Sequence, residues 1–239
     1  MTLLLFLGSV FLPLSPPTSA LFFHTLQTPA YAIIFVLCSF AWLTALLAAS
    51  GVWWLFFPLH GDSQEIAVFI SFASTFITIF GIYLFFKRLE RSSLMSSISM
   101  LLPQKSISAM FTVGTSISLL HCIMLCLPIV SYSTGKETLY TASCPAVNYF
   151  FVLSVQEFFS VLALLFSPIS ILFGLDRKKP MYVVLASIGI ALSLLSPLAM
   201  RMVGGCGMAF GIAGAGSLLT IVSALLAMRS ERVFPFHRH

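Results

Sequence analysis

Two side chains that can bind or release a proton lie deep inside long apolar stretches of the sequence. Glu157 is the one charged residue in the middle of such a stretch, with Gln156 beside it, and His121 is the one histidine in a comparable position. A charge at the centre of a bilayer costs about 3 kcal/mol on insertion scales, so such residues are normally paired or functional. Glu157 is therefore either a carboxyl that carries protons or a protonated carboxyl held by a hydrogen bond in packed surroundings.

His121 and Glu157 fall at the same expected depth. They belong to consecutive apolar stretches, 109–131 and 147–174, which must run antiparallel if both cross a membrane. Each residue lies about ten positions from the end that faces the loop 132–146, which places both about 15 Å deep at 1.5 Å per residue. We predict that they form an intramembrane polar pair. The spacing predicts the depth of the two residues but not whether each one faces the bundle interior or the lipid.

Catalytic constellations are missing from the sequence. An intramembrane aspartyl protease needs two carboxylates in one site, but the only aspartates, Asp62 and Asp176, lie in loops on opposite sides of the expected membrane. The chain contains neither His-Glu-x-x-His nor Gly-x-Ser-x-Gly. No further metal ligand is expected at the depth of His121. The sequence thus predicts no enzymatic activity, no metal and no cofactor.

The composition is that of a protein that crosses the membrane several times. Of the 239 residues, 59% are hydrophobic and 8% are charged, whereas soluble domains carry about a quarter charged residues. We expect an all-α, polytopic helix bundle that forms a single domain, 1–239. Seven stretches reach the roughly 20 apolar residues that a membrane-spanning helix needs. They are 3–23, 32–57, 66–86, 109–131, 147–174, 181–200 and 207–228.

The basic residues predict the orientation of these spans. Ten of the twelve lysines and arginines fall on one side, which the positive-inside rule assigns to the cytosol. The N-terminus is then lumenal or extracellular and the C-terminus cytosolic. Because the basic residues sit in short loops between spans, they do not indicate nucleic-acid binding. "TSA" at 18–20 resembles a signal-peptide cleavage site, but cleavage would leave six spans and move the ten basic residues outside.

Small residues spaced four apart form stripes on three of the expected spans. Such stripes let two helices approach closely in lipid, within one chain or between chains. They consist of Ala41, Ala45 and Ala49; Gly114, Ser118 and Cys122; and Gly207, Gly211 and Ala215. The first lies in "FAWLTALLAASGVWW" (40–54), whose tryptophans we expect near the membrane interfaces.

Two loops carry further predictions. Cys144 and Cys206 both fall on the lumenal side, where disulfides persist, and a bridge between them would tie the fifth span to the seventh. The other three cysteines, Cys38, Cys122 and Cys126, lie within spans and act as small apolar residues. In the loop 87–108, the segment 94–102 is either a short helix on the membrane surface or part of a flexible serine-rich linker.

The first quarter of the chain resembles the anterior-pharynx-defective family, the polytopic scaffold subunit of γ-secretase. "FLGSVFLPLSPPTSALFFHTLQTPAYAIIFVLCSFAWLTALLAASGVWW" (6–54) is similar to the first two helices of that family nearly without gaps. The resemblance continues more weakly through all seven spans. "ILFGLDRKK" (171–179) is similar to the basic turn between helices five and six, and "AGAGSLLTI" (213–221) to the final helix.

The chain departs from the family pattern in several places. The glycine stripe of the fourth helix reads Gly114, Ser118 and Cys122 here, so only its first member is glycine. The family's interior histidines of helices five and six are replaced by "LALLFSPIS" (162–170) and "ASIGIALSLLSP" (186–197). The polar Gln-Glu pair of the family's third helix has no counterpart within the span 66–86. The chain resembles a divergent member.

The resemblance implies a non-catalytic subunit that stabilises presenilin together with nicastrin and the presenilin enhancer. It implies a multi-pass protein of the endoplasmic reticulum, Golgi, endosomes and plasma membrane that supports proteolysis of type I membrane proteins. Two other classes stay open. A proton-coupled transporter would use Glu157, although no clear internal repeat is found. A seven-helix receptor would share the topology, but Asp-Arg-Tyr after the third span and Asn-Pro-x-x-Tyr in the seventh are missing.

Overall fold

The computed structural model of the chain describes residues 3–56, 63–91, 107–133, 140–141, 144–200 and 205–233. Within them, seven α-helices, one π-helical turn and one small two-stranded sheet follow one another. The elements are α1 (Leu3–Ala20), η1 (Leu21–Thr25), α2 (Pro29–Phe56), α3 (Ser63–Arg91), α5 (Ile107–Ser133), β1 (Tyr140–Thr141), β2 (Cys144–Asn148), α6 (Tyr149–Asp176), α7 (Pro180–Ala199) and α8 (Cys206–Val233). The segment 94–102, expected as a surface helix or a linker, lies outside the described residues.

The expectation of an all-α polytopic bundle is confirmed. Six of the helices, α2, α3, α5, α6, α7 and α8, are long and apolar enough to cross a membrane. α1 is not among those six; it is 18 residues long, contains Pro13, Pro16 and Pro17, and continues directly into the π-helical turn. Prolines remove backbone donors inside a helix, and membrane helices tolerate them where neighbouring helices satisfy the freed groups. α1 has such neighbours, because it packs on both α5 and α6.

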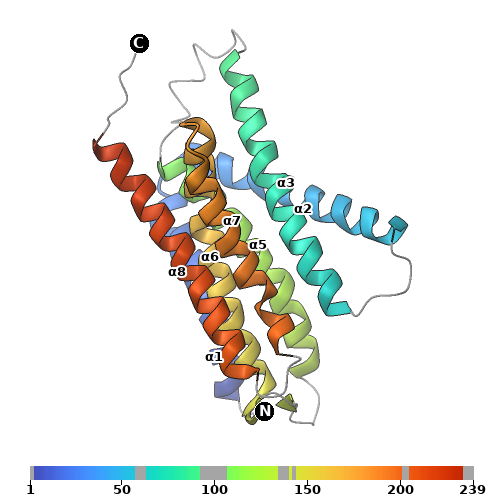
Figure 1. Cartoon of the computed structure of the whole chain (residues 1–239). Helices are drawn as coiled ribbons and strands as arrows, with labels where there is room; N and C mark the ends of the chain where they lie inside the picture. The colour runs from blue at the N-terminus through green and yellow to red at the C-terminus, as the bar shows by residue number, and fades with distance from the viewer. Residues whose placement is uncertain are drawn as a thin grey trace.

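The helix α6 is the centre of the bundle. It packs against α1, α5, α7 and α8. In its apolar, membrane-spanning stretch 72% of the residues are buried, against 28% in α2 and in α3. Figure 1 shows α1, α5, α6, α7 and α8 running alongside one another, while α2 crosses at a steep angle and α3 lies beside it at the edge. α1 begins and α8 ends at opposite ends of the bundle (Figure 1), as expected if the seven described helices alternate in direction.

Local sequence explains where α6 and α7 begin. Asn148 caps α6, because its side-chain oxygen accepts a hydrogen bond of 2.9 Å from the Phe150 amide. α7 begins at Pro180, and proline suits the first helical position because its missing donor would be unpaired there anyway.

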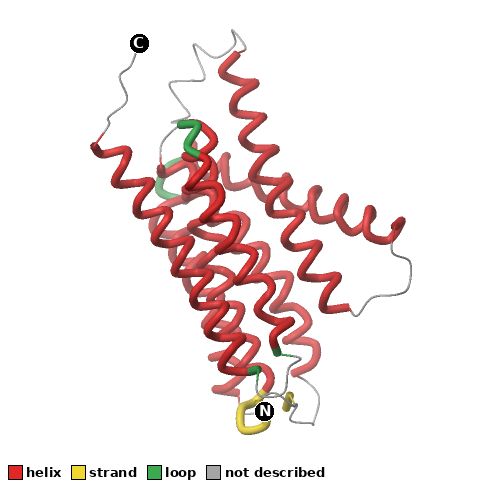
Figure 2. The backbone as a smooth tube through the Cα atoms, viewed as in Figure 1, coloured by secondary structure: helices red, strands yellow, loops and turns green. Residues whose placement is uncertain are grey.

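The short sheet is the part of the fold that the sequence analysis does not anticipate. β1 and β2 pair antiparallel, with Tyr140 opposite Asn148 and Thr141 opposite Cys144. The sheet lies at the same end of the bundle as the start of α1 (Figure 2). β2 runs directly into α6, so the sheet fixes how the chain enters the central helix.

Candidate functional site

Gly114 lies where α5 meets the backbone of α6, the most buried helix of the bundle. A Cβ atom placed on Gly114 would overlap the backbone carbonyl of Leu165 on α6. The contact is with backbone rather than with the flexible end of a side chain, so no rotamer change would relieve it. The first residue of this stripe therefore sets the α5–α6 distance within the chain.

The other members of the stripe on α5 are buried as well. Ser118 is fully buried and donates a hydrogen bond to Thr115 O within its own helix, and Cys122 is buried one turn further. Between them and Gly114, the Ser116 hydroxyl lies 2.9 Å from the Ser39 hydroxyl of α2. This link between α2 and α5 is one that sequence reasoning missed, because a lone serine gives no periodic signal.

The alanine stripe on α2 points partly inward. Ala45 and Ala49 are buried, and Ala41 is half-buried. The expectation that the tryptophans of this segment lie near the interfaces is wrong for Trp42, which is completely buried with its ring edge-on to His121, at 6.4 Å between centroids. The bundle interior, rather than the lipid headgroup region, holds this indole. Trp54, near the end of α2, is 74% exposed.

The stripe on α8 differs from the other two. Gly207 and Gly211 are exposed, and a Cβ atom on either would meet no described atom within 4 Å. Ala215, one turn further, is exposed too. This face of α8 packs against no described helix of the chain, although its spacing is the same as that of the stripe on α5.

Two other glycines, Gly189 and Gly216, lie where α8 contacts α7. A Cβ atom on Gly189 of α7 would lie 2.8 Å from Gly216 O, and one on Gly216 would lie 2.6 Å from Gly189 O. The backbones of α7 and α8 therefore touch at this crossing. Sequence analysis missed Gly189, since a single glycine in a span forms no stripe; its signal is the pairing of Gly-x-x-x-Ser (189–193) with Gly-x-x-x-Thr (216–220).

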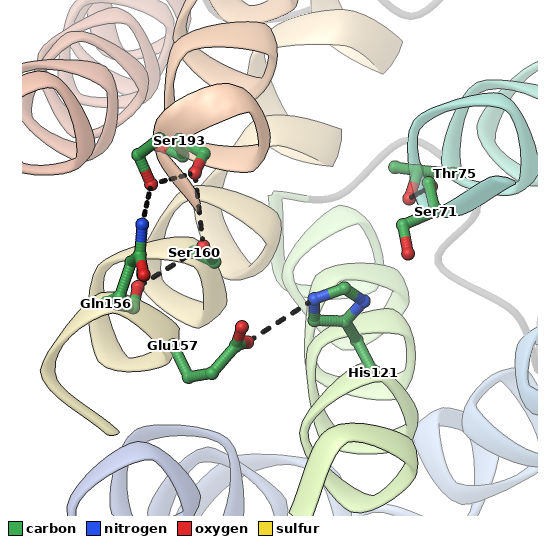
Figure 3. A network of polar contacts seen from close by, with 8 residues as sticks. Ser71, Thr75, His121, Gln156, Glu157, Ser160 and Ser193 are labelled. Carbon is green, nitrogen blue, oxygen red and sulfur yellow. Dashed lines mark hydrogen bonds and ion pairs between the residues drawn. The ribbon is translucent and has the colours of Figure 1, made fainter. Parts of the chain in front are cut away.

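His121 and Glu157 lie side by side in the bundle interior. The distance from His121 Nε2 to Glu157 Oε2 is 3.6 Å, and the two side chains are 4% and 7% exposed (Figure 3). That distance suits an ion pair but exceeds a direct hydrogen bond. Attraction between two buried groups of this kind offsets part of the cost of removing both from water.

A separate set of polar contacts joins α6 to α7, beginning at Gln156, the neighbour of Glu157 in the sequence. The Gln156 side-chain amide donates a hydrogen bond of 2.9 Å to the Ser196 hydroxyl, which in turn donates to Ser193 O at 2.8 Å. Ser160 lies 3.2 Å from Gln156 O and 3.4 Å from Ser193 O (Figure 3). These contacts join α6 to α7 by side-chain hydrogen bonds, as expected for polar residues between membrane helices.

Four buried polar atoms in this region have no hydrogen-bond partner within the described part of the chain. They are His121 Nε2, Glu157 Oε2, Gln156 Oε1 and Trp42 Nε1. Atoms of this kind can form hydrogen bonds with a small polar molecule such as water. Across the described ranges, no three histidine, cysteine, aspartate or glutamate side chains gather as they would around a metal ion. The arrangement suits structural polar contacts better than a reaction centre.

Cys144 and Cys206 are joined by a disulfide. Their Cα atoms are 5.6 Å apart across a sequence separation of 62 residues, which lies within the usual range for a bridge. Cys144 opens β2, next to the start of α6, and Cys206 is the first residue of α8. The bridge therefore fixes α8 to the central helix at the end of the bundle where the sheet lies.

We expect the Cys206→Ser variant to lose about 2–4 kcal/mol of stability, because a disulfide that closes a long loop restricts the unfolded chain. Thermal unfolding of the purified protein in detergent measures this loss. Cys38→Ser is the matched control, since Cys38 is outside the bridge. Peptide mapping without reductant should recover Cys144 linked to Cys206, and finding both as free thiols would contradict the prediction.

Comparison with known proteins assigns the chain to a family of membrane proteins. The family model described as Aph-1 protein matches residues 4–230, nearly the whole chain. None of the curated proteins compared with the chain matches it. The family match begins within α1 and ends within α8, so it includes every described helix. The chain belongs to the Aph-1 protein family.

Proposed function

We propose that this protein is the non-catalytic scaffold subunit of a γ-secretase complex. The observation that carries the proposal is the Aph-1 match over residues 4–230, which covers the whole bundle rather than one segment of it. In this role the protein holds presenilin, nicastrin and the presenilin enhancer together in the membrane. It thereby supports cleavage of type I membrane proteins, which presenilin carries out.

Two kinds of helix surface in the structure suit a scaffold role. Inside the bundle, Gly114 and the Gly189–Gly216 crossing hold helices at backbone contact. Outside it, the exposed stripe of Gly207 and Gly211 would let a helix of another subunit approach equally closely. We assign this outer stripe to subunit assembly. The His121–Glu157 pair is assigned to stabilisation of the bundle.

Affinity purification in a mild detergent, followed by mass spectrometry, tests the proposal. We expect the tagged protein to recover a presenilin-like aspartyl protease, and recovery of none of the three partner classes would refute the scaffold role. Gly211→Leu should lower this recovery, because the new side chain would occupy the space for a partner helix. Gly81→Leu on α3 is the control, since a Cβ atom there also meets nothing within 4 Å. Equal recovery with both variants would argue against the α8 stripe as the interface.

A further inference from the structure

Three consecutive basic residues, Arg177, Lys178 and Lys179, join α6 to α7. Lys178 and Lys179 are exposed, and the Arg177 guanidinium lies over the Phe173 ring at 5.9 Å from its centroid. Among the described side chains at this end of the bundle, Asp176 is the one acid. The turn is therefore a cationic surface. In the proposed orientation it faces the cytosolic leaflet.

The turn has a fixed shape. The Lys179 amide donates to Gly174 O at 2.9 Å and the Arg177 amide to Phe173 O at 3.0 Å, which closes the end of α6 in the manner of a Schellman motif. Lys178 stands at the left-handed position of this motif, with φ 53°. Glycine is the residue that normally occupies this position, because it has no Cβ to clash. The backbone of the turn therefore holds Lys178 at a fixed place between α6 and α7.

The end of α8 adds to the same surface. Lys179 Nζ lies 3.5 Å from the Ser230 hydroxyl, and Arg229 beside it is exposed. The α6–α7 turn and the C-terminal end of α8 lie at the same end of the bundle (Figure 1). Cations from two separate parts of the chain thus gather at one level.

An apolar strip runs along α7 directly below the cations. Met181, Val184 and Ile188 are 57%, 54% and 46% exposed, and their spacing places them on one helix face. A cationic turn above an exposed apolar strip matches a molecule with a negative head and a hydrocarbon tail. A free phosphate or headgroup would use the cations and leave the strip without a role.

We propose that the α6–α7 turn binds an anionic phospholipid of the cytosolic leaflet. The headgroup lies against Lys178, Lys179 and Arg229, and an acyl chain lies along the strip that begins at Met181. Basic groups between membrane helices on the cytosolic side are suited to such headgroups. The inference rests on the proposed orientation in the membrane and is independent of the assembly role, so loss of partner recovery leaves it intact.

Native mass spectrometry of the full chain tests the site. The probes are dioleoylphosphatidylserine and dioleoylphosphatidylcholine, which share their acyl chains and differ in headgroup charge. The variant combines Lys178→Asn with Lys179→Gln, because asparagine tolerates the left-handed backbone. We expect phosphatidylserine binding to fall roughly 30-fold, given the attraction of anionic lipid to each of the two basic residues, and phosphatidylcholine binding to stay unchanged. The control pair, Lys87→Gln with Arg88→Gln at the end of α3, removes two exposed charges elsewhere and should leave binding as in the parent protein.

Equal losses with both pairs would show a general surface attraction and overturn the site, as would no loss with either. Glycerophosphoserine, the headgroup without chains, should not compete at the lipid concentration; effective competition would overturn the lipid in favour of a soluble ligand. If the double variant unfolds, Lys178→Gly gives the same comparison. Glycine suits the backbone at this position, so we expect this variant to melt no lower than the parent while phosphatidylserine binding still falls.

Discussion

Replacement of Gly114 by leucine is expected to separate α5 from α6 and to prevent recovery of the folded bundle. A Cβ atom at this position already overlaps the backbone of Leu165, and the rest of the leucine side chain would have to be accommodated as well. Overpacking of a core costs about 1–3 kcal/mol and occasionally more; with backbone as the obstacle, we expect the upper end of that range or beyond. Membrane insertion should persist, because leucine makes the span more apolar.

Fluorescence-detected size exclusion of the detergent-solubilised protein, before and after heating, measures this effect. Gly51→Leu on α2 is the matched control, since a Cβ atom there has no described atom within 4 Å. Gly114→Ala should show a smaller loss in the same direction. A Gly114→Leu protein that melts with the parent and still recovers its partners would contradict the close contact between α5 and α6.

The second large effect is expected at the buried pair. His121→Ala removes the imidazole that lies 3.6 Å from the Glu157 carboxyl, and Glu157→Ala removes the carboxyl from beside the imidazole. Removing one partner of a buried ionic pair costs about 3–5 kcal/mol, although water entering the site would reduce that figure. The double variant should lose clearly less than the sum of the two, because it leaves no isolated buried group.

A double-mutant cycle on thermal stability measures this coupling, which we expect within the range of about 0.5–3 kcal/mol for residues in contact. The control cycle pairs His121→Ala with Ser154→Ala. Ser154 is buried on α6 near Glu157, but its hydroxyl donates to Phe150 O within its own helix. Additive losses in the control cycle and coupled losses in the test cycle are the expected outcome. Additive losses in both would show that the pair contributes no stability of its own.

Depth in the membrane could be predicted from this sequence, whereas the facing direction of the helices could not. Span boundaries follow from runs of apolar residues, and counting positions along two such runs is enough to place His121 and Glu157 at one level. The same reasoning places Cys144 and Cys206 on one side. Whether a helix turns a given residue towards the bundle depends on contacts between elements far apart in the chain. Those contacts decide that Trp42 is buried among helices.

The glycine stripes show the same limit most directly. Gly114 and Gly211 both belong to a run of small residues spaced four apart, yet one lies against backbone and the other has no described atom nearby. A stripe of small residues shows that another helix can approach closely, but it does not identify that helix. Gly189 contributes to a backbone crossing without belonging to any stripe, because its partner, Gly216, supplies the second small surface.

The central place of α6 also has a consequence for biosynthesis. α6 is the fifth of the seven described helices in chain order, and it supplies the surface against which α1 and α5 are buried. Those contacts cannot form until ribosomes have completed more than half of the chain and the insertion machinery has released α6. Until then, α1, α2, α3 and α5 can contact one another, but the faces of α1 and α5 that pack on α6 have no partner helix. The bundle is therefore incomplete, and its inner faces are accessible to membrane quality control, until α6 is inserted.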